Sequence, residues 1–165
     1  SSHNSTEKKV MAQLSQNFSL DELIKSQTAE RKGIDNYPNA DQIYNLTALA
    51  EIILQPIRNK WGSFVVGSGY RSEKLCEAIG SKPTSHHCCN DGYSASDFEV
   101  AGIDNYELAT WIRDESNLPF CQLILECYKG GNSGWIHISY HPDDIRKECL
   151  TYHRSTGYRK GLLPK

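Results

Sequence analysis

Apolar residues recur at helical spacing through residues 39–61, and this pattern predicts the main core helix. The apolar positions are Ile43, Leu46, Leu49, Ala50, Ile53, Leu54, Ile57 and Trp61, which share one face at 3.6 residues per turn. Asn39 and Gln42 form a capping pair at its start. Pro56 lies inside the pattern and predicts a kink, because proline loses one backbone hydrogen bond and clashes with the preceding turn.

Three shorter helices are predicted where a capping residue precedes apolar positions. They run from Ser19 to about Gly33, from Ser72 to Gly80, and from Asp104 to a point before Pro119. Continuous or alternating apolar residues predict strands at 64–68, 94–100, 120–128 and 135–140. The glycine-rich turn 130–134 joins the last two into an antiparallel hairpin, and Thr156-Gly157 is a candidate turn for another. Helices that precede and interrupt antiparallel strands indicate the α+β class.

The hairpin carries a prediction about chemistry, because side chains alternate between the two faces of a strand. Leu123, Leu125, Ile136 and Ile138 all favour the core face. Glu126 and His137 then share the opposite, polar face, and a register with Leu125 beside Ile138 places them directly opposite each other. The pair is either a cross-strand ion pair or a metal ligand beside a general base.

Composition limits the function classes. The net charge is −2, so nothing indicates nucleic-acid binding, and no apolar run reaches the length of a membrane span. We expect one domain at 14–165, with a flexible segment at 1–13 and a basic C-terminal extension from about 142. The extension either contacts an anionic polymer or is a solvated surface. We expect a monomer. The spacing of the six cysteines is not that of a small, disulfide-stabilised domain. It predicts free thiols in a reducing compartment.

Two stretches hold the candidate chemistry, residues 84–97 and residues 134–139. Together they offer histidine, aspartate and histidine, a donor set that suits zinc with one position open for water. An open position is typical of a catalytic metal, which lowers the pKa of bound water. The alternative is that these are ordinary polar residues at strand ends.

Five motifs in order resemble the zinc D-Ala-D-Ala carboxypeptidase family, and most closely its phage-type, endolysin-like branch of peptidoglycan peptidases. They are Ser68-Gly69-Tyr70-Arg71, Ser85-His86-His87, Gly92 with Ala95-Ser96-Asp97-Phe98-Glu99-Val100, Gln122-Leu123-Ile124-Leu125-Glu126, and Trp135-Ile136-His137-Ile138-Ser139. The segment from Leu14 to Leu23 also looks like the start of that branch, so the resemblance covers about residues 14–140.

The resemblance implies an α+β fold shared with the hedgehog signalling domain, and zinc held by His87, Asp97 and His137. It also implies a carboxylate base, which here is Glu126, and an arginine near the scissile bond, which here is Arg71. Arg71 would bind a substrate carboxylate or steady the oxyanion.

Ser85 would hydrogen-bond the substrate or the metal ligands. The implied partner is the stem peptide of peptidoglycan. No secretory-signal pattern is visible, so we expect the protein in the host cytoplasm until its release to the cell wall, or on a virion.

The sequence departs from the family at two places. Residues 88–96 separate His87 from Asp97, three more than the family's six, which leaves His86 as the alternative ligand and Cys88 and Cys89 as competing thiolates. We predict His87, the third residue of Ser-x-His, with the extra residues bulging outward between Cys88 and Tyr93. Many relatives carry the catalytic acid three residues before the last histidine; Gly134 stands there, so Glu126 must serve.

The prediction is therefore a zinc peptidase that cuts a peptide bond in bacterial peptidoglycan. One alternative is a non-catalytic virion or cell-wall-binding module of the same fold. Another is a cysteine hydrolase using Cys88 or Cys89 with His86.

Overall fold

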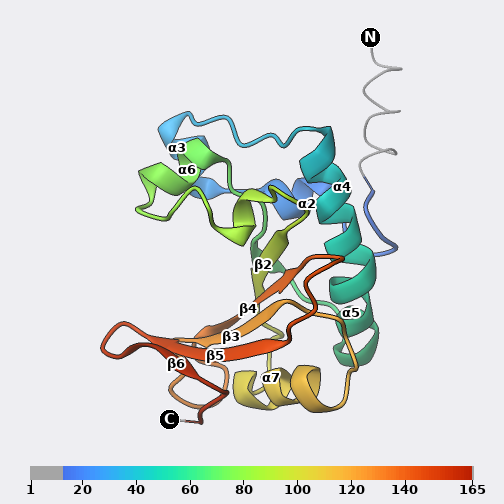
Figure 1. The fold of residues 1–165 in the computed structure, drawn as a ribbon, viewed down its shortest axis with the longest axis vertical. Helices are drawn as coiled ribbons and strands as arrows, with labels where there is room; N and C mark the ends of the chain where they lie inside the picture. The colour runs from blue at the N-terminus through green and yellow to red at the C-terminus, as the bar shows by residue number, and fades with distance from the viewer. Residues whose placement is uncertain (1–12, 165) are drawn as a thin grey trace.

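A six-stranded sheet organises the computed structural model, which describes residues 13–164 (Figure 1). The strands are β1 (Val66–Ser68), β2 (Ser94–Phe98), β3 (Gln122–Glu126), β4 (Trp135–Tyr140), β5 (Glu148–His153) and β6 (Gly157–Lys160). Their order across the sheet is β1-β2-β4-β3-β5-β6. The β3–β5 pair is parallel and the other neighbours are antiparallel. Of the expected flexible segment, all but residue 13 lies outside the described residues.

The helices lie around this sheet, and the α+β class is confirmed. They are α2 (Leu20–Ile24), α3 (Gln27–Lys32), α4 (Ala40–Leu49), η1 (Ala50–Leu54), α5 (Gln55–Trp61), α6 (Glu73–Ala78), η2 (His86–Cys88) and α7 (Asn105–Asp114). The predicted caps Ser19, Asn39, Ser72 and Asp104 each accept a backbone N–H from the first turn of their helix. The segment predicted as one helix after Ser19 is two, α2 and α3, separated by the cap of α3 at Ser26.

The main core helix continues from Ala40 to Trp61 through a π-helical segment, η1. In η1 the N–H of Gln55 donates to the carbonyl of Ala50, five residues earlier. Pro56 follows directly, so the departure from α-helical hydrogen bonding falls in the turn that the proline ring would crowd. The proline thus coincides with a wider turn and does not end the helix.

The core lies between the helices and one face of the sheet. Leu123, Leu125, Ile136 and Ile138 are fully buried on that face, where α4 and α7 contact β2, β3 and β4. Truncating one such side chain to alanine typically costs about 2–5 kcal/mol of unfolding free energy. Among the described residues, no helix is long and apolar enough to cross a membrane.

The register of the β3–β4 hairpin corrects one prediction. Glu126 pairs with Trp135, and Ile124 pairs with His137, so Glu126 is not opposite His137. The face assignment is correct, but alternation constrains a register only to within steps of two residues. The observed register places Leu123 opposite Ile138 and Leu125 opposite Ile136, which aligns both apolar pairs.

The C-terminal residues form the β5–β6 hairpin, which extends the sheet beyond β3 (Figure 1). The turn at Thr156-Gly157 lies where it was predicted, with the N–H of Thr156 donating to the carbonyl of His153. The segment that the sequence predicts to be a basic extension therefore supplies two strands of the sheet.

Candidate metal centre

His87 is held by three hydrogen bonds from separate parts of the chain. Its backbone N–H donates to Ser85 Oγ at 3.2 Å, and its carbonyl accepts from the Arg71 N–H at 2.9 Å. Its ring Nδ1 lies 2.7 Å from the carbonyl oxygen of Gly69. A carbonyl only accepts, so the ring hydrogen is on Nδ1 and the Nε2 lone pair is free. A backbone partner of this kind commonly orients a metal-binding histidine.

Asp97 and His137 come from adjacent strands. They are direct partners in the β2–β4 ladder, so their side chains leave the same face of the sheet. His137 Nδ1 lies 3.0 Å from Asp97 Oδ1. The opposite face of both strands packs into the core, with Phe98 and Ile136 fully buried, so both side chains of the pair point away from the core.

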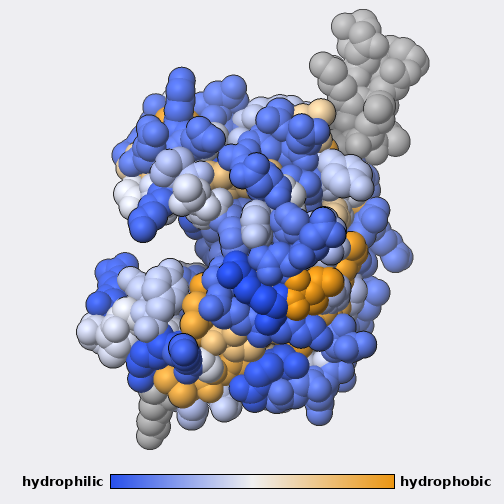
Figure 2. All heavy atoms as spheres, in the orientation of Figure 1, coloured by the Kyte–Doolittle hydropathy of each residue, from blue (hydrophilic) through white to orange (hydrophobic). Residues whose placement is uncertain are grey.

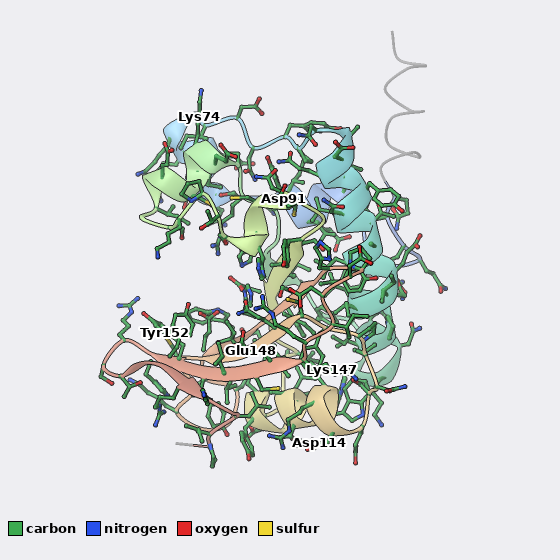
Figure 3. The ribbon with its side chains drawn as sticks, in the orientation of Figure 1. Lys74, Asp91, Asp114, Lys147, Glu148 and Tyr152 are labelled. Atoms are coloured by element: carbon green, nitrogen blue, oxygen red, sulfur yellow. The ribbon has the colours of Figure 1, made fainter. Side chains whose placement is uncertain are left out.

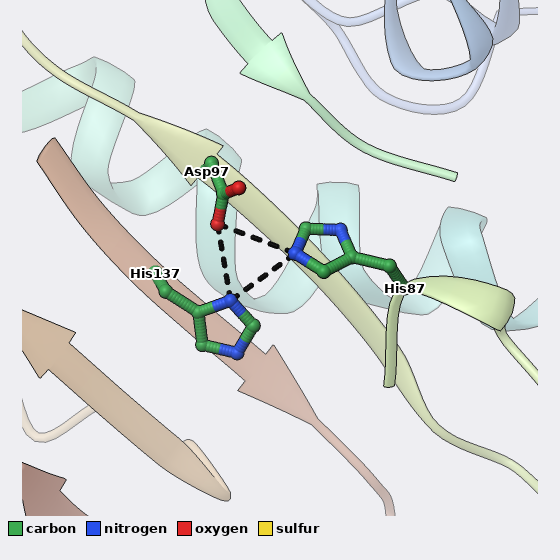
Figure 4. Close-up of side chains that lie close together, drawn as sticks. All are labelled: His87, Asp97 and His137. Atoms are coloured by element: carbon green, nitrogen blue, oxygen red, sulfur yellow. Dashed lines mark hydrogen bonds and ion pairs between the residues drawn. The ribbon is translucent and has the colours of Figure 1, made fainter. Parts of the chain in front are cut away.

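The three side chains converge on one point (Figure 4). His87 Nε2 lies 3.2 Å from His137 Nδ1 and 3.2 Å from Asp97 Oδ1. Ligand bonds of about 2.0–2.1 Å in a tetrahedron would separate the ligand atoms by about 3.3 Å. With neutral rings, at most one hydrogen is available for the three contacts, so a cation is the natural occupant. The donor set therefore fits a metal ion.

Arg71 fixes the second oxygen of Asp97. Its Nη2 donates to Asp97 Oδ2 at 3.1 Å, while its Nε donates to Ser68 Oγ at 3.0 Å. The other oxygen of Asp97, Oδ1, therefore faces His87 and His137. Burial alone would raise the pKa of Asp97, but the interactions with His87 and His137 outweigh burial and hold the pKa well below its usual value.

Glu126 lies on the same face of the sheet as the cluster, two residues along β3 from Ile124, which is the partner of His137. Its Oε2 accepts a hydrogen bond from Trp135 Nε1 at 2.7 Å. Burial, and then the nearby Asp97 carboxylate, raise the pKa of Glu126 above its usual value, although His137, Trp135 and Arg71 act in the opposite direction. A carboxylate whose pKa is raised towards neutrality is suited to proton transfer.

All the site residues predicted from the sequence line one cleft. Arg71, Ser85, His87, Asp97, Glu126 and His137 are among its lining residues. Residues 80–82 and 84–86 form one wall, and Tyr158 of β6 belongs to the other. Figure 2 shows the corresponding deep notch between the upper helices and the β5–β6 hairpin. A polymer could therefore reach the cluster from outside.

The loop before Asp97 departs from the predicted outward bulge. Cys88 and Cys89 are buried, because Gln42 Nε2 donates to the carbonyl of Cys88 at 3.1 Å and Asn45 Nδ2 to that of Cys89 at 2.9 Å. Only the exposed Asp91 and its half-buried neighbours turn outward. These long-range bonds from α4 draw the first part of the loop into the core.

Neither thiol of this loop belongs to the cluster. Cys88 Sγ lies 3.3 Å from Cys76 Sγ, and all six cysteines are free. Burial raises the pKa of Cys88 to about 12, and also raises the pKa of Cys89. Both thiols are therefore protonated at neutral pH, which argues against a cysteine nucleophile.

His86 also stands apart from the cluster. Its ring stacks on Tyr93 at 4.2 Å between centroids, and burial lowers the pKa of His86 to about 4.

Gly134, the position at which many relatives carry the catalytic acid, has no room for a side chain. Its φ is +68°, and a Cβ there would overlap the carbonyl oxygen of Glu126 and the backbone of Cys127. No glutamate fits at this position without moving the hairpin.

Sequence reasoning did not identify the roles of Ser68, the Gly69 carbonyl or Trp135, although all three lie inside the quoted motifs. Their roles depend on which atoms face the site, which a motif does not specify.

An α+β domain with an open cleft over a His-Asp-His cluster has the features that a metal-dependent hydrolase needs. A family model described as peptidase M15 matches residues 16–139. The chain belongs to the peptidase M15 family, and is thus a member of a metallopeptidase family. No curated protein matches the sequence.

Proposed function

We propose that this chain is a zinc peptidase that hydrolyses a peptide bond in bacterial peptidoglycan. One observation carries the proposal: three lone-pair donors converge on a point that opens onto a cleft containing Glu126. The ligands would be His87 Nε2, His137 Nδ1 and Asp97 Oδ1. Two nitrogens and one oxygen with an open fourth position are typical of catalytic zinc sites.

Zinc, when bound, supplies a Lewis acid that polarises the scissile carbonyl and acidifies a water. The protein supplies the proton transfers. Glu126 accepts the proton of the attacking water and returns it to the leaving amine nitrogen. Its hydrogen bond from Trp135 holds one carboxylate oxygen, so the group is oriented before the substrate arrives.

Arg71 and Ser85 position the substrate in this proposal. Two N–H groups of Arg71 are engaged with Asp97 and Ser68, and a guanidinium has five. The remaining three can bind a substrate carboxylate or the developing oxyanion. Ser85 Oγ accepts from the His87 N–H and retains its own hydrogen for donation to the substrate.

The substrate assignment rests on the motif resemblance to the phage-type branch and on the open cleft. The stem peptide of peptidoglycan is an extended chain anchored to a polymer, and the notch in Figure 2 is open to such a chain. We place the reaction at the cell wall, after release from the host cytoplasm or from a virion.

The test measures metal content and wall hydrolysis in one preparation. Protein purified without chelator should carry one zinc per chain, lower the turbidity of outer-membrane-stripped cells and release peptide termini. Chelation should abolish the turbidity loss and the release of peptide termini, and added zinc should restore both activities.

His137→Ala should lose zinc and activity, whereas His153→Ala, also on a strand of the sheet, should lose neither. Stoichiometric zinc in His137→Ala would refute the ligand assignment. Wall binding without hydrolysis by the zinc-loaded parent would instead support the non-catalytic module.

A further inference from the structure

The cleft face of the sheet continues beyond the cluster along one row of paired residues. Glu126 of β3 pairs with Tyr152 of the parallel strand β5, and Tyr152 pairs with Tyr158 of β6. Directly paired residues project from the same face of a sheet. Since Glu126 faces the cleft, both tyrosines are on the cleft side.

Tyr158 is the exposed member of this row. It lines the same cleft as Glu126 and the cluster, yet 61% of its surface is accessible. Its ring centroid lies 4.8 Å from that of Tyr152, so Tyr152 supports one side of the ring. Figure 3 labels Tyr152 on the hairpin, at the lower border of the notch.

The aromatic surface continues to the catalytic carboxylate. Trp135, the partner of Glu126 in the hairpin, is also partly exposed and lines the cleft. Tyr158 belongs to a hairpin that lies outside the segment matched by the family model, which ends at residue 139. The wall of the cleft that it forms is therefore a feature of this chain that the family match does not assign.

We propose that Tyr158 is a substrate-positioning residue that stacks against a sugar ring of the glycan strand, next to the peptide bond that is cut. This inference rests on the proposed peptidoglycan substrate. An exposed tyrosine presents a rigid, amphipathic face at a low entropic cost, and the apolar face of a pyranose is flat enough to cover it. Because Tyr152 supports the ring, little side-chain freedom is lost on binding.

A cross-strand aromatic pair also stabilises a hairpin, so the test needs a readout that a structural role would not change. That readout is dependence on the sugar. The rate constant kcat/KM is measured for a stem peptide linked to its disaccharide and for the same peptide without sugar. The parent should prefer the linked substrate by roughly 2- to 10-fold, as expected for one aromatic contact, through a lower KM.

In Tyr158→Ala the preference should collapse towards one, while Tyr158→Phe should retain it. Tyr44→Ala is the matched control, because Tyr44 is 75% exposed on α4 and does not belong to the residues lining this cleft. Equal losses on both substrates, or no loss on either, would overturn the proposal. The first result would assign Tyr158 to the peptide or to hairpin stability, which the melting temperature distinguishes.

A binding measurement separates this inference from the proposed function. Glu126→Gln and the double variant Glu126→Gln/Tyr158→Ala are sedimented with glycan strands stripped of peptide. Weaker binding of the double variant supports the sugar contact even if the parent hydrolyses no wall. Equal binding refutes the contact, even if the parent proves to be an active peptidase.

Discussion

The cluster is built from two regions that hold their side chains in different ways. Asp97 and His137 are paired residues of the β2–β4 ladder, so backbone hydrogen bonds and the buried face behind them fix their positions. His87 lies in the three-residue helix η2 and is held by Ser85, Gly69 and the N–H of Arg71. The strand ladder therefore holds Asp97 and His137 (the sheet side of the cluster), whereas the position of His87 (the loop side) depends on a few individual hydrogen bonds.

The largest effect tests which loop histidine completes the cluster. His87→Ala should lose stoichiometric zinc and all measurable turnover, because two protein ligands hold zinc poorly. His86→Ala is the matched control and should retain zinc, since His86 stacks on Tyr93 outside the cluster. Metal analysis of both variants at equal protein concentration is the measurement. Loss of zinc in His86→Ala with retention in His87→Ala would exchange the two assignments.

The second effect concerns Glu126 on the sheet side. Glu126→Gln keeps the shape and one acceptor but cannot take a proton, so turnover should fall roughly 100- to 10,000-fold. Zinc content and melting temperature should stay close to those of the parent, because the amide oxygen can still accept from Trp135 Nε1. A destabilised variant with full specific activity would make Glu126 a structural residue.

The third effect weakens the loop side without removing a ligand. Ser85→Ala deletes the acceptor of the His87 N–H, and loss of a group that orients a ligand typically costs about 10- to 100-fold in metal affinity. We expect the lower end, because the Gly69 carbonyl still orients the ring. Competition with a fluorescent zinc chelator measures the affinity.

Ser72→Ala is the control for this third variant, since Ser72 caps α6 in the same way but does not contact a ligand. If Ser85→Ala binds zinc as tightly as Ser72→Ala, the loop is more rigid than the comparison with the sheet implies.

The same contrast separates what the sequence predicts from what it does not. The caps at Ser19 and Asn39, and the shared face of Glu126 and His137, follow from local patterns of two to four residues. The register of the β3–β4 hairpin does not, since a shift by two residues preserves every face. The burial of Cys88 and Cys89 depends on donors from Gln42 and Asn45, more than 40 residues away.

For the C-terminal hairpin, the sequence predicts the turn but not the pairing of its strands with the rest of the sheet. Basic residues interrupt its alternation, and its inner strand β5 pairs in parallel with β3, a contact that no local turn specifies. The turn at Thr156-Gly157 is the one feature of this hairpin that the sequence predicts.

The fourth effect moves the pH profile. The hydrogen bond from Trp135 stabilises the charged form of Glu126 and lowers its pKa, against the raising effect of burial. Trp135→Phe removes this bond, so the pKa of Glu126 should rise further. Since the base must be deprotonated, the acidic limb of kcat should move to higher pH, with little change on its alkaline side. Zinc content at each pH is the control. If the acidic limb does not move, a group other than Glu126 is responsible for it.

The smallest effect tests the thiols beside the loop ligand. Thiolates bind zinc strongly, but Cys88 and Cys89 are buried with raised pKa values, and Cys88 contacts Cys76 away from the cluster. The double variant Cys88→Ser/Cys89→Ser should therefore bind one zinc with unchanged affinity. Its melting temperature should fall, because two hydroxyl groups enter the core. If the double variant loses zinc, Asp97 and His137 supply two ligands and a cysteine thiolate supplies the third. The loop ligand is then a cysteine and not His87.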